Sequence, residues 1–222
     1  MIDKLRSILN KVTAEYADIR HETMHDTRIS FNGKELTEVG SNTTDGYVLR
    51  ILDRGGFSSV AFTAYDDHEK AIAAAMENAR IMSKASAQPV AFAKTGVVKD
   101  EYLPRLDDDP RKITIDEKLQ LTKKYNDLVL AQDKIATTSI AYVETIREKD
   151  FASTEGSDVR EELITVRISG LVTSRDGNLI QNVRVAAGGS HGFAILRNRE
   201  DDFERKTRIA IDLPKAQPIQ GG

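Results

Sequence analysis

The chain has 222 residues, of which 40% are hydrophobic, and its 32 basic and 35 acidic side chains give a net charge of −3. This length and composition suit one large globular domain or two small ones, and they argue against disorder. Because the chain has no basic excess and no Trp, we expect no nucleic-acid partner. The absence of Cys excludes disulfides, thiol nucleophiles and cysteine-based zinc sites within this chain.

The sequence carries no membrane-targeting pattern. Residues 1–6 lack the apolar run of a signal peptide. No stretch approaches the run of about 18 apolar residues that can span a bilayer. We therefore expect a cytoplasmic protein with no membrane partner.

The first part of the chain predicts an α+β unit over residues 1–86. Apolar residues at helical spacing predict a helix over 2–15. Alternating apolar and polar residues, with a turn signal at Asn32-Gly33, predict a four-stranded antiparallel meander. Its strands are expected over 16–31, 34–42, 46–52 and 57–63. An Ala-rich helix is predicted from Asp66-Asp67 to about Lys84.

Residues 87–113 have no clear hydrophobic period and contain Pro89, Pro104 and Pro110. Proline at this density is typical of irregular structure. We therefore expect a linker, or a strap packed over a neighbouring element.

Residues 114–222 predict a second α+β unit. The order Thr114-Ile115-Asp116-Glu117 has the form of a capping box and predicts a helix over about 115–131. Alternating residues predict antiparallel strands, with a turn at Asp176-Gly177 and a strand that ends at Gly188-Gly189. A last helix is expected over 201–211, stopping near Asp212 because Pro214 follows. The fold class predicted is α+β, with two units that each hold a mainly antiparallel sheet flanked by helices.

His21-Glu22-Thr23-Met24-His25 matches H-E-x-x-H, which forms a zinc site only on a helix. Here the neighbouring residues alternate, so the segment is predicted to be a strand, in which four residues span roughly 13 Å. Two imidazoles that bind one zinc ion at about 2.0–2.1 Å each cannot be so far apart. We therefore assign no metal ligand to this motif.

Three other motifs do not predict a functional site. Gly188-Gly189-Ser190-His191-Gly192 spells G-x-S-x-G, but His191, inside the motif, is the only histidine after Ser190, and the sheet is predicted antiparallel. Gly55-Gly56 lacks a following Lys-Ser/Thr, so it does not predict phosphate binding. Asp107-Asp108-Asp109 has no calcium-loop spacing and is expected to be a solvated loop. No catalytic, cofactor-binding or metal-binding residue is assigned to this chain.

Several blocks resemble one protein family when they are taken in order. The strand Tyr16–Arg20, the paired segments 45–50 and 55–63, and the Ala-rich helix over 67–83 resemble the first part of TldD/PmbA-type proteins. Phe151-Ala152-Ser153-Thr154-Glu155-Gly156 resembles their serine-x-glutamate-glycine turn, and residues 216–222 resemble the segment that leads into their last domain. The resemblance covers roughly residues 14–222.

This resemblance implies the N-terminal portion of a cytosolic zinc metallopeptidase, of which some members are labelled modulators of DNA gyrase. Their zinc motif is a helical H-E-x-x-x-H in a C-terminal half, so zinc is expected in a half that this chain lacks and no cofactor in the chain itself. The expected partners are a peptide or unfolded polypeptide substrate and a second family subunit, in a homo- or heterodimer. The region would form part of the substrate cavity and the subunit interface, and the chain alone would be inactive.

Two alternatives remain open from the sequence. One is a standalone binding or scaffold protein, or a non-catalytic partner subunit of a peptidase. The other is a self-contained zinc peptidase that uses His21, Glu22 and His25. Metal analysis separates the second from the rest.

Overall fold

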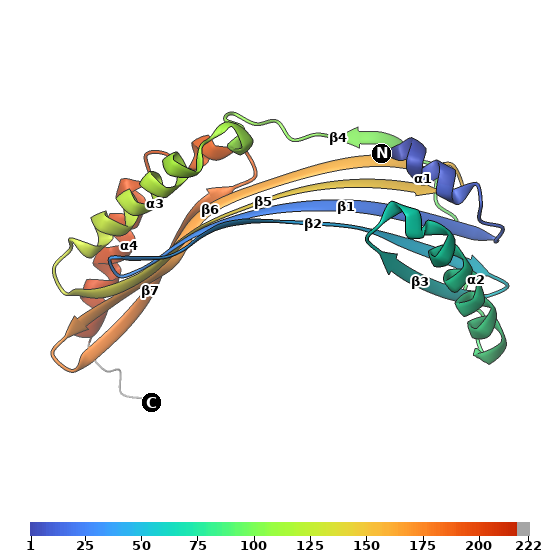
Figure 1. The fold of residues 1–222 in the computed structure, drawn as a ribbon. Helices are drawn as coiled ribbons and strands as arrows, with labels where there is room; N and C mark the ends of the chain where they lie inside the picture. Colours follow the sequence, from blue (N-terminus) through green and yellow to red (C-terminus); the bar gives the residue numbers. More distant parts are fainter. Residues whose placement is uncertain (217–222) are drawn as a thin grey trace. The chain divides into compact units, whose positions relative to one another are not determined.

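A computed structural model describes residues 1–216 and gives an α+β fold, as predicted (Figure 1). The helices that it describes are α1 (Ile2–Leu9), α2 (His68–Ala85), α3 (Ile115–Leu130) and α4 (Glu200–Asp212). The strands are β1 (Tyr16–Asn32), β2 (Glu35–Asp53), β3 (Gly56–Phe62), β4 (Lys99–Tyr102), β5 (Ile135–Ser153), β6 (Asp158–Asp176) and β7 (Leu179–Gly189). The family-like segment over 217–222 lies outside the described residues.

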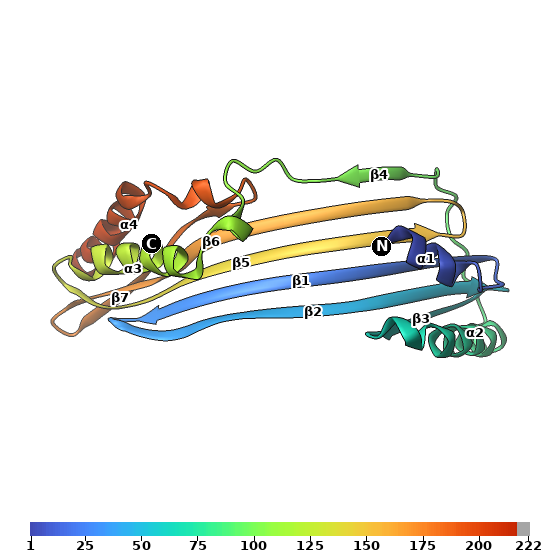
Figure 2. The ribbon, with the colours of Figure 1, turned by 45° about the horizontal axis from the view of Figure 1, so that its top comes forward.

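The described strands form one sheet with the order β3-β2-β1-β5-β6-β4, and β7 pairs with β6 (Figure 2). The β2–β3 and β6–β7 pairs are antiparallel, while the short β4 runs parallel to β6. The chain divides into two compact units, and β1, β2, β5 and β6 contribute residues to both. Each unit has its own core.

In the first unit, α1 and α2 cover one face of the sheet. Leu5 and Ile8 of α1 and Ala75 of α2 pack with Ile19 of β1 and Leu49 of β2, and all five side chains are fully buried. Ile19 alternates with Asp18 and Arg20, and Leu49 alternates with Val48 and Arg50, so these neighbours lie on the opposite face. That opposite face is the one that carries charge.

In the second unit, α3 and α4 pack together, and α4 also packs on β7. The rings of Tyr125 on α3 and Phe203 on α4 stack with centroids 4.7 Å apart. Ile140 of β5 and Ile168 of β6 lie in the same buried cluster. The helix α3 begins at the predicted capping box, in which Thr114 accepts a hydrogen bond from the Glu117 amide and Glu117 accepts one from the Thr114 amide.

Three elements differ from their predictions. The helix predicted over 2–15 ends at Leu9, and Val12 reaches the core from the turn that follows. The two strands predicted over 34–42 and 46–52 are one strand, β2, so three strands replace the expected four-stranded meander. The polar run between the predicted strands stays extended because β1 supplies its partners, as in the 2.9 Å hydrogen bond between Thr27 and Ser41.

The third difference is β4, which lies in the segment where a linker or strap was expected. Its four residues pair with residues 158–161 of β6, and all four are exposed. The last helix stops at Asp212, as Pro214 predicted.

Candidate functional site

The H-E-x-x-H residues lie on β1, so the predicted strand over this motif is confirmed. His21 is buried, with its Nε2 2.8 Å from Oδ2 of Asp45 on β2. Thr23 donates a hydrogen bond of 2.7 Å to the same carboxylate oxygen. His25 follows four residues along the extended chain, which separates the two histidines by roughly 13 Å. This donor set does not fit a zinc ion, and no group of three or more His, Asp or Glu within residues 1–216 is arranged to hold a metal.

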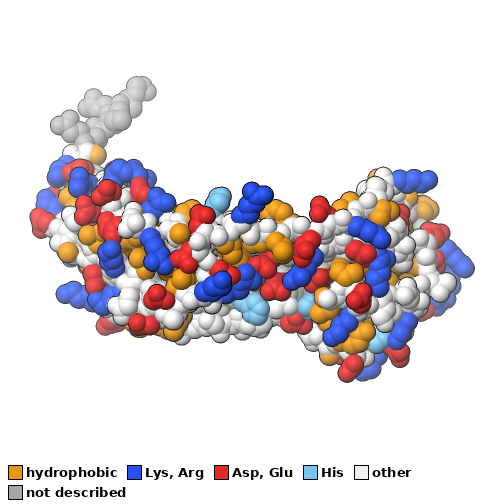
Figure 3. All heavy atoms as spheres, turned by 90° about the horizontal axis from the view of Figure 1, so that it is seen from above, with side chains coloured by type: hydrophobic (Ala, Val, Ile, Leu, Met, Phe, Trp, Pro, Cys, Tyr) orange, Lys and Arg blue, Asp and Glu red, His pale blue; other side chains and the backbone are white. Residues whose placement is uncertain are grey.

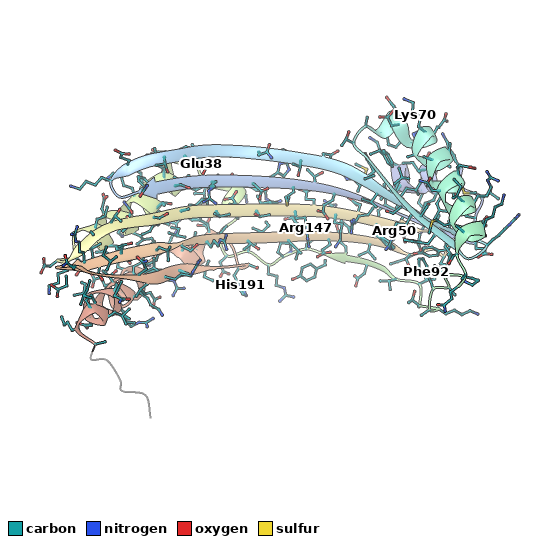
Figure 4. The ribbon with its side chains drawn as sticks, turned by 90° about the horizontal axis from the view of Figure 1, so that it is seen from below. Glu38, Arg50, Lys70, Phe92, Arg147 and His191 are labelled. Carbon is teal, nitrogen blue, oxygen red and sulfur yellow. The ribbon has the colours of Figure 1, made fainter. Side chains whose placement is uncertain are left out.

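The G-x-S-x-G segment and the acidic run meet in one loop junction of the second unit. Asp108 accepts a hydrogen bond of 2.7 Å from the Phe193 amide through its backbone carbonyl, and its carboxylate accepts one of 2.8 Å from Arg197. A Cβ at Gly192 would lie 2.5 Å from the Asp108 carbonyl oxygen, and the backbone there has φ +100°. Only glycine at position 192 therefore lets the backbone at Asp108 approach this closely. Figure 4 labels His191 in this junction.

The neighbouring Asp109 is also engaged. Its carboxylate accepts hydrogen bonds from the Arg111 side chain and amide, and the hydrogen bonds from the Arg111 side chain hold the pKa of this carboxyl below its usual value. Asp108 and Asp109 are thus each bound by an arginine, whereas Asp107 is exposed and donates its amide to the His191 carbonyl. The loop predicted there also contacts the segment that follows β7.

Gly55 lies in the β2–β3 turn with φ +75°, and Gly56 begins β3. A Cβ at Gly56 would lie 2.0 Å from the Ala79 carbonyl oxygen on α2. Glycine at this position therefore lets the helix approach the sheet.

The charged face of the first unit is the feature that the sequence did not reveal. Asp18 is 1% exposed, although it lies on the polar parity of β1. Arg50 of β2 donates two hydrogen bonds to it, from Nε to Oδ1 at 2.8 Å and from Nη2 to Oδ2 at 2.7 Å. Tyr16 donates a third at 2.8 Å. Paired donors in a fixed fork make this a strong ion pair.

The electrostatics of this pair follow from burial and hydrogen bonding. Burial, with the hydrogen bond to Asp18, raises the pKa of the Tyr16 phenol. The hydrogen bonds to Asp18 raise the pKa of the Arg50 guanidinium. Tyr16 and Arg50 therefore keep their protons near neutral pH, and both donate hydrogen bonds to the Asp18 carboxylate.

A second ion pair lies on the same face. Lys149 of β5 pairs with Glu161 of β6, and Arg147 lies 3.6 Å from the same carboxylate. The hydrogen bond from Lys149 lowers the pKa of Glu161 below its usual value. Figure 4, seen from below, labels Arg50 and Arg147 on this face.

Between these pairs the face is hollowed. A hollow of about 310 Å³ is lined by both ion pairs and by Arg20 of β1. A neighbouring hollow of about 510 Å³ is lined by Arg20, Glu22 and Asp45, and it lies where β3 ends at Phe62. Arg20 is exposed, and within residues 1–216 it makes no ion pair or hydrogen bond through its side chain.

Figure 3 shows the molecule from above. Basic and acidic side chains are interspersed on this side, in line with the near-balanced composition. None of the described helices has the length and apolar character needed to cross a membrane.

Comparisons with known proteins place the fold in a family. Residues 17–82 match PmbA/TldA metallopeptidase domain 1, and residues 108–215 match the PmbA/TldA metallopeptidase central domain. The chain therefore belongs to the PmbA/TldD family of metallopeptidases, as the resemblance of its strand and turn segments predicted.

Relatives and solved structures agree with this assignment. A metalloprotease of Methanothermobacter thermautotrophicus is 28% identical over 99% of this chain and 48% of its own length, and one of Synechocystis sp. is 24% identical over 94% and 45%. The chain thus spans about half the length of these relatives.

The fold is similar to that of a Thermotoga maritima protein described as a modulator of a DNA gyrase, with a TM-score of 0.78 at 16% identity over 93% of this chain and 46% of that one. TldE from Thermococcus kodakarensis gives 0.70 at 15% identity, over 95% and 46%.

Proposed function

We propose that this chain is a non-catalytic N-terminal region of a PmbA/TldD-type metallopeptidase, which holds an extended polypeptide substrate and takes part in subunit association. Zinc and the residues that use it would belong to a C-terminal half. The relatives named metalloproteases, of which the chain spans about half, support this division. The distance between His21 and His25, which is too large for both to bind one zinc ion, also supports this division.

The observation that carries the proposal is the open edge of β2. Within the described residues, β3 pairs only with residues 47–53 of β2, so the preceding part of β2 has β1 on one side and no strand on the other. An unpaired edge presents backbone N–H and C=O groups that can accept one more strand. A peptidase substrate that is unfolded can supply that strand whatever its side chains are.

The part of this edge in the second unit, residues 35–42, is exposed at every position. Leu36 and Val39 are 47% and 46% exposed and lie on opposite faces of the strand, because their positions differ by an odd number. Glu38, labelled in Figure 4, is held by a 2.9 Å hydrogen bond from Arg28 of β1. A strand bound to this edge would therefore lie beside an apolar side chain on each face of the sheet, Leu36 on one and Val39 on the other. It would also lie beside the charged side chain of Glu38.

The outer edge of β7 is a competing position. Within the described residues β7 pairs only with β6, but α4 packs against it, and from Val183 onward its residues alternate between exposed and covered. The helix restricts access to one face of any strand added there, so β2 is the edge that we propose.

Hydrogen–deuterium exchange tests this assignment. The chain is mixed with an unfolded ten-residue peptide of Ala, Val and Ser, and amide exchange is followed with and without the peptide. We expect slower exchange within 35–42 and unchanged exchange within 179–189. Protection of 179–189 instead would move the substrate to β7, and no protection at either edge would contradict the proposed peptide-holding role.

A further inference from the structure

Within residues 1–216, Arg20 is the one charged side chain that lines the smaller hollow without forming an ion pair. It projects from β1 on the face opposite the buried Ile19, and it lines both hollows of the charged face. A guanidinium is positively charged at any physiological pH, so Arg20 can bind an anion.

The charges around the smaller hollow leave a single positive surplus. Its lining holds three cations, Arg20, Arg50 and Lys149, against two carboxylates. Asp18 is taken by Arg50 and Glu161 by Lys149. Three minus two leaves one positive charge, which matches a monoanion.

The larger hollow has the opposite balance. Arg20 lines it together with two acidic residues, Glu22 and Asp45, of which Asp45 is already bound by His21 and Thr23. An anion drawn to Arg20 is repelled on that side, so it is directed to the smaller hollow.

The remaining wall of the smaller hollow is apolar. Val48, Phe151 and Val159 line it, and each is partly buried. Its volume of about 310 Å³ is at the small end of ligand pockets, which run from roughly 300 to 1,000 Å³. The hollow thus suits a short group that joins one carboxylate to one apolar side chain.

We propose that Arg20 binds the C-terminal carboxylate of a polypeptide whose last residue is apolar. This rests on the proposed function, in which the chain holds polypeptide. The guanidinium fork matches a carboxylate in two parallel hydrogen bonds, and the apolar wall takes the last side chain. Arg50 and Lys149 are balanced by Asp18 and Glu161, so Arg20 supplies the positive charge for the ligand.

The test uses an N-terminally labelled Ala-Ala-Val-Leu peptide with a free C-terminal carboxylate, beside the same peptide amidated. Binding to the full chain is measured by fluorescence anisotropy. We expect the free acid to bind at least about tenfold more tightly than the amide, the loss typical of one charge-assisted hydrogen bond. Arg20→Ala should remove this preference, and Arg20→Lys should retain part of it.

Arg167→Ala is the matched control. Arg167 is likewise an exposed strand arginine without an ion pair in the described residues, and it lies on β6 in the second unit. Its loss should leave the preference for the acid unchanged. An amidated peptide with an internal Asp, and inorganic phosphate as a competitor, separate a side-chain carboxylate and a phosphate from a chain terminus.

The outcomes separate this inference from the proposed function. If acid and amide bind equally, or if Arg20→Ala keeps the preference, the terminal-carboxylate site is refuted while peptide holding stands. If the amidated Asp peptide or phosphate binds at Arg20 as tightly as the free acid, the terminal assignment is also refuted. If neither the acid nor the amide binds at millimolar concentration, the inference and the peptide-holding role both fail.

Discussion

Lys118 of α3 forms an ion pair with Glu144 of β5, with Nζ 2.7 Å from Oε2, and both side chains are at most 7% exposed. The Tyr142 hydroxyl donates to the same carboxylate oxygen, and its ring lies 5.9 Å from the ammonium. Burial, with this hydrogen bond, raises the pKa of the Tyr142 phenol. The pair ties α3 to the sheet inside the core of the second unit.

Removing one member of this pair should cost far more than removing both. Glu144→Gln leaves the Lys118 ammonium buried without an anion, and we expect a loss of about 3–5 kcal/mol in the free energy of unfolding. The double variant Lys118→Met with Glu144→Leu should recover most of that loss. Urea unfolding followed by circular dichroism measures each value.

The control is Lys123→Met on the same helix, whose pair with Asp127 is about half exposed. Its cost should stay below about 0.5 kcal/mol. Equal losses for Glu144→Gln and Lys123→Met would show that burial does not govern the strength of these pairs.

The Lys149–Glu161 pair predicts a pH dependence. The folded-state pKa of Glu161 is lowered, so its contribution to stability is present above the usual carboxyl pKa of about 4.3 and is lost as pH falls through the lower folded value. We expect Glu161→Gln to cost about 0.5–1 kcal/mol at pH 7 and progressively less below pH 4.5. Glu35→Gln changes an exposed strand position, so its effect on the free energy of unfolding should not change in this way with pH. A cost for Glu161→Gln that stays constant down to pH 2 is the contrary result.

Two glycines in strands should respond oppositely to alanine. A Cβ at Gly56 would lie 2.0 Å from the Ala79 carbonyl oxygen, while a Cβ at Gly40 would meet nothing within 4 Å. Gly56→Ala should therefore lower the free energy of unfolding by about 1–3 kcal/mol, because α2 must shift. Gly40→Ala should be neutral, or stabilising by about 0.5 kcal/mol through the unfolded state. Thermal melts test this: Gly56→Ala should have the lower melting temperature. Similar melting temperatures for the two variants would contradict the close approach of α2 to the sheet.

The capping box of α3 offers a local test. Thr114→Ala removes the side-chain acceptor for the Glu117 amide, and we expect a loss of about 1 kcal/mol in unfolding free energy. Thr114→Ser keeps the hydroxyl and should retain most of that stability. Urea unfolding compares the two, and an equal loss in both would show that the hydroxyl does not stabilise the helix.

Local signals predicted the elements that depend on local chemistry. Alternation of Ile19, Ile29 and Phe31 with polar residues predicted β1, and the α3 capping box and the Asp176-Gly177 turn are confirmed. The sequence did not predict that β2 is continuous, because the polar run in its middle has no apolar period. That run is stabilised by contacts with β1, such as the hydrogen bonds between Asp45 of β2 and His21 and Thr23 of β1.

The charged face was missed for a related reason. Asp18 and Arg50 are 32 residues apart in sequence, and only the strand order makes them neighbours. Nothing in the sequence selects Asp18 from 35 acidic residues. The usable signal was that Asp18, Arg20 and Glu22 share the polar face of a strand whose other face is buried.

The central proposal is that this region holds polypeptide and does not itself bind the zinc of a peptidase. The most direct measurement is the zinc content of the purified chain and of His21→Ala, read beside cleavage of an unfolded peptide. We predict no His21-dependent zinc and no cleavage, with the peptide bound intact. Stoichiometric zinc that is lost in His21→Ala, together with cleavage by the parent chain, would contradict the account.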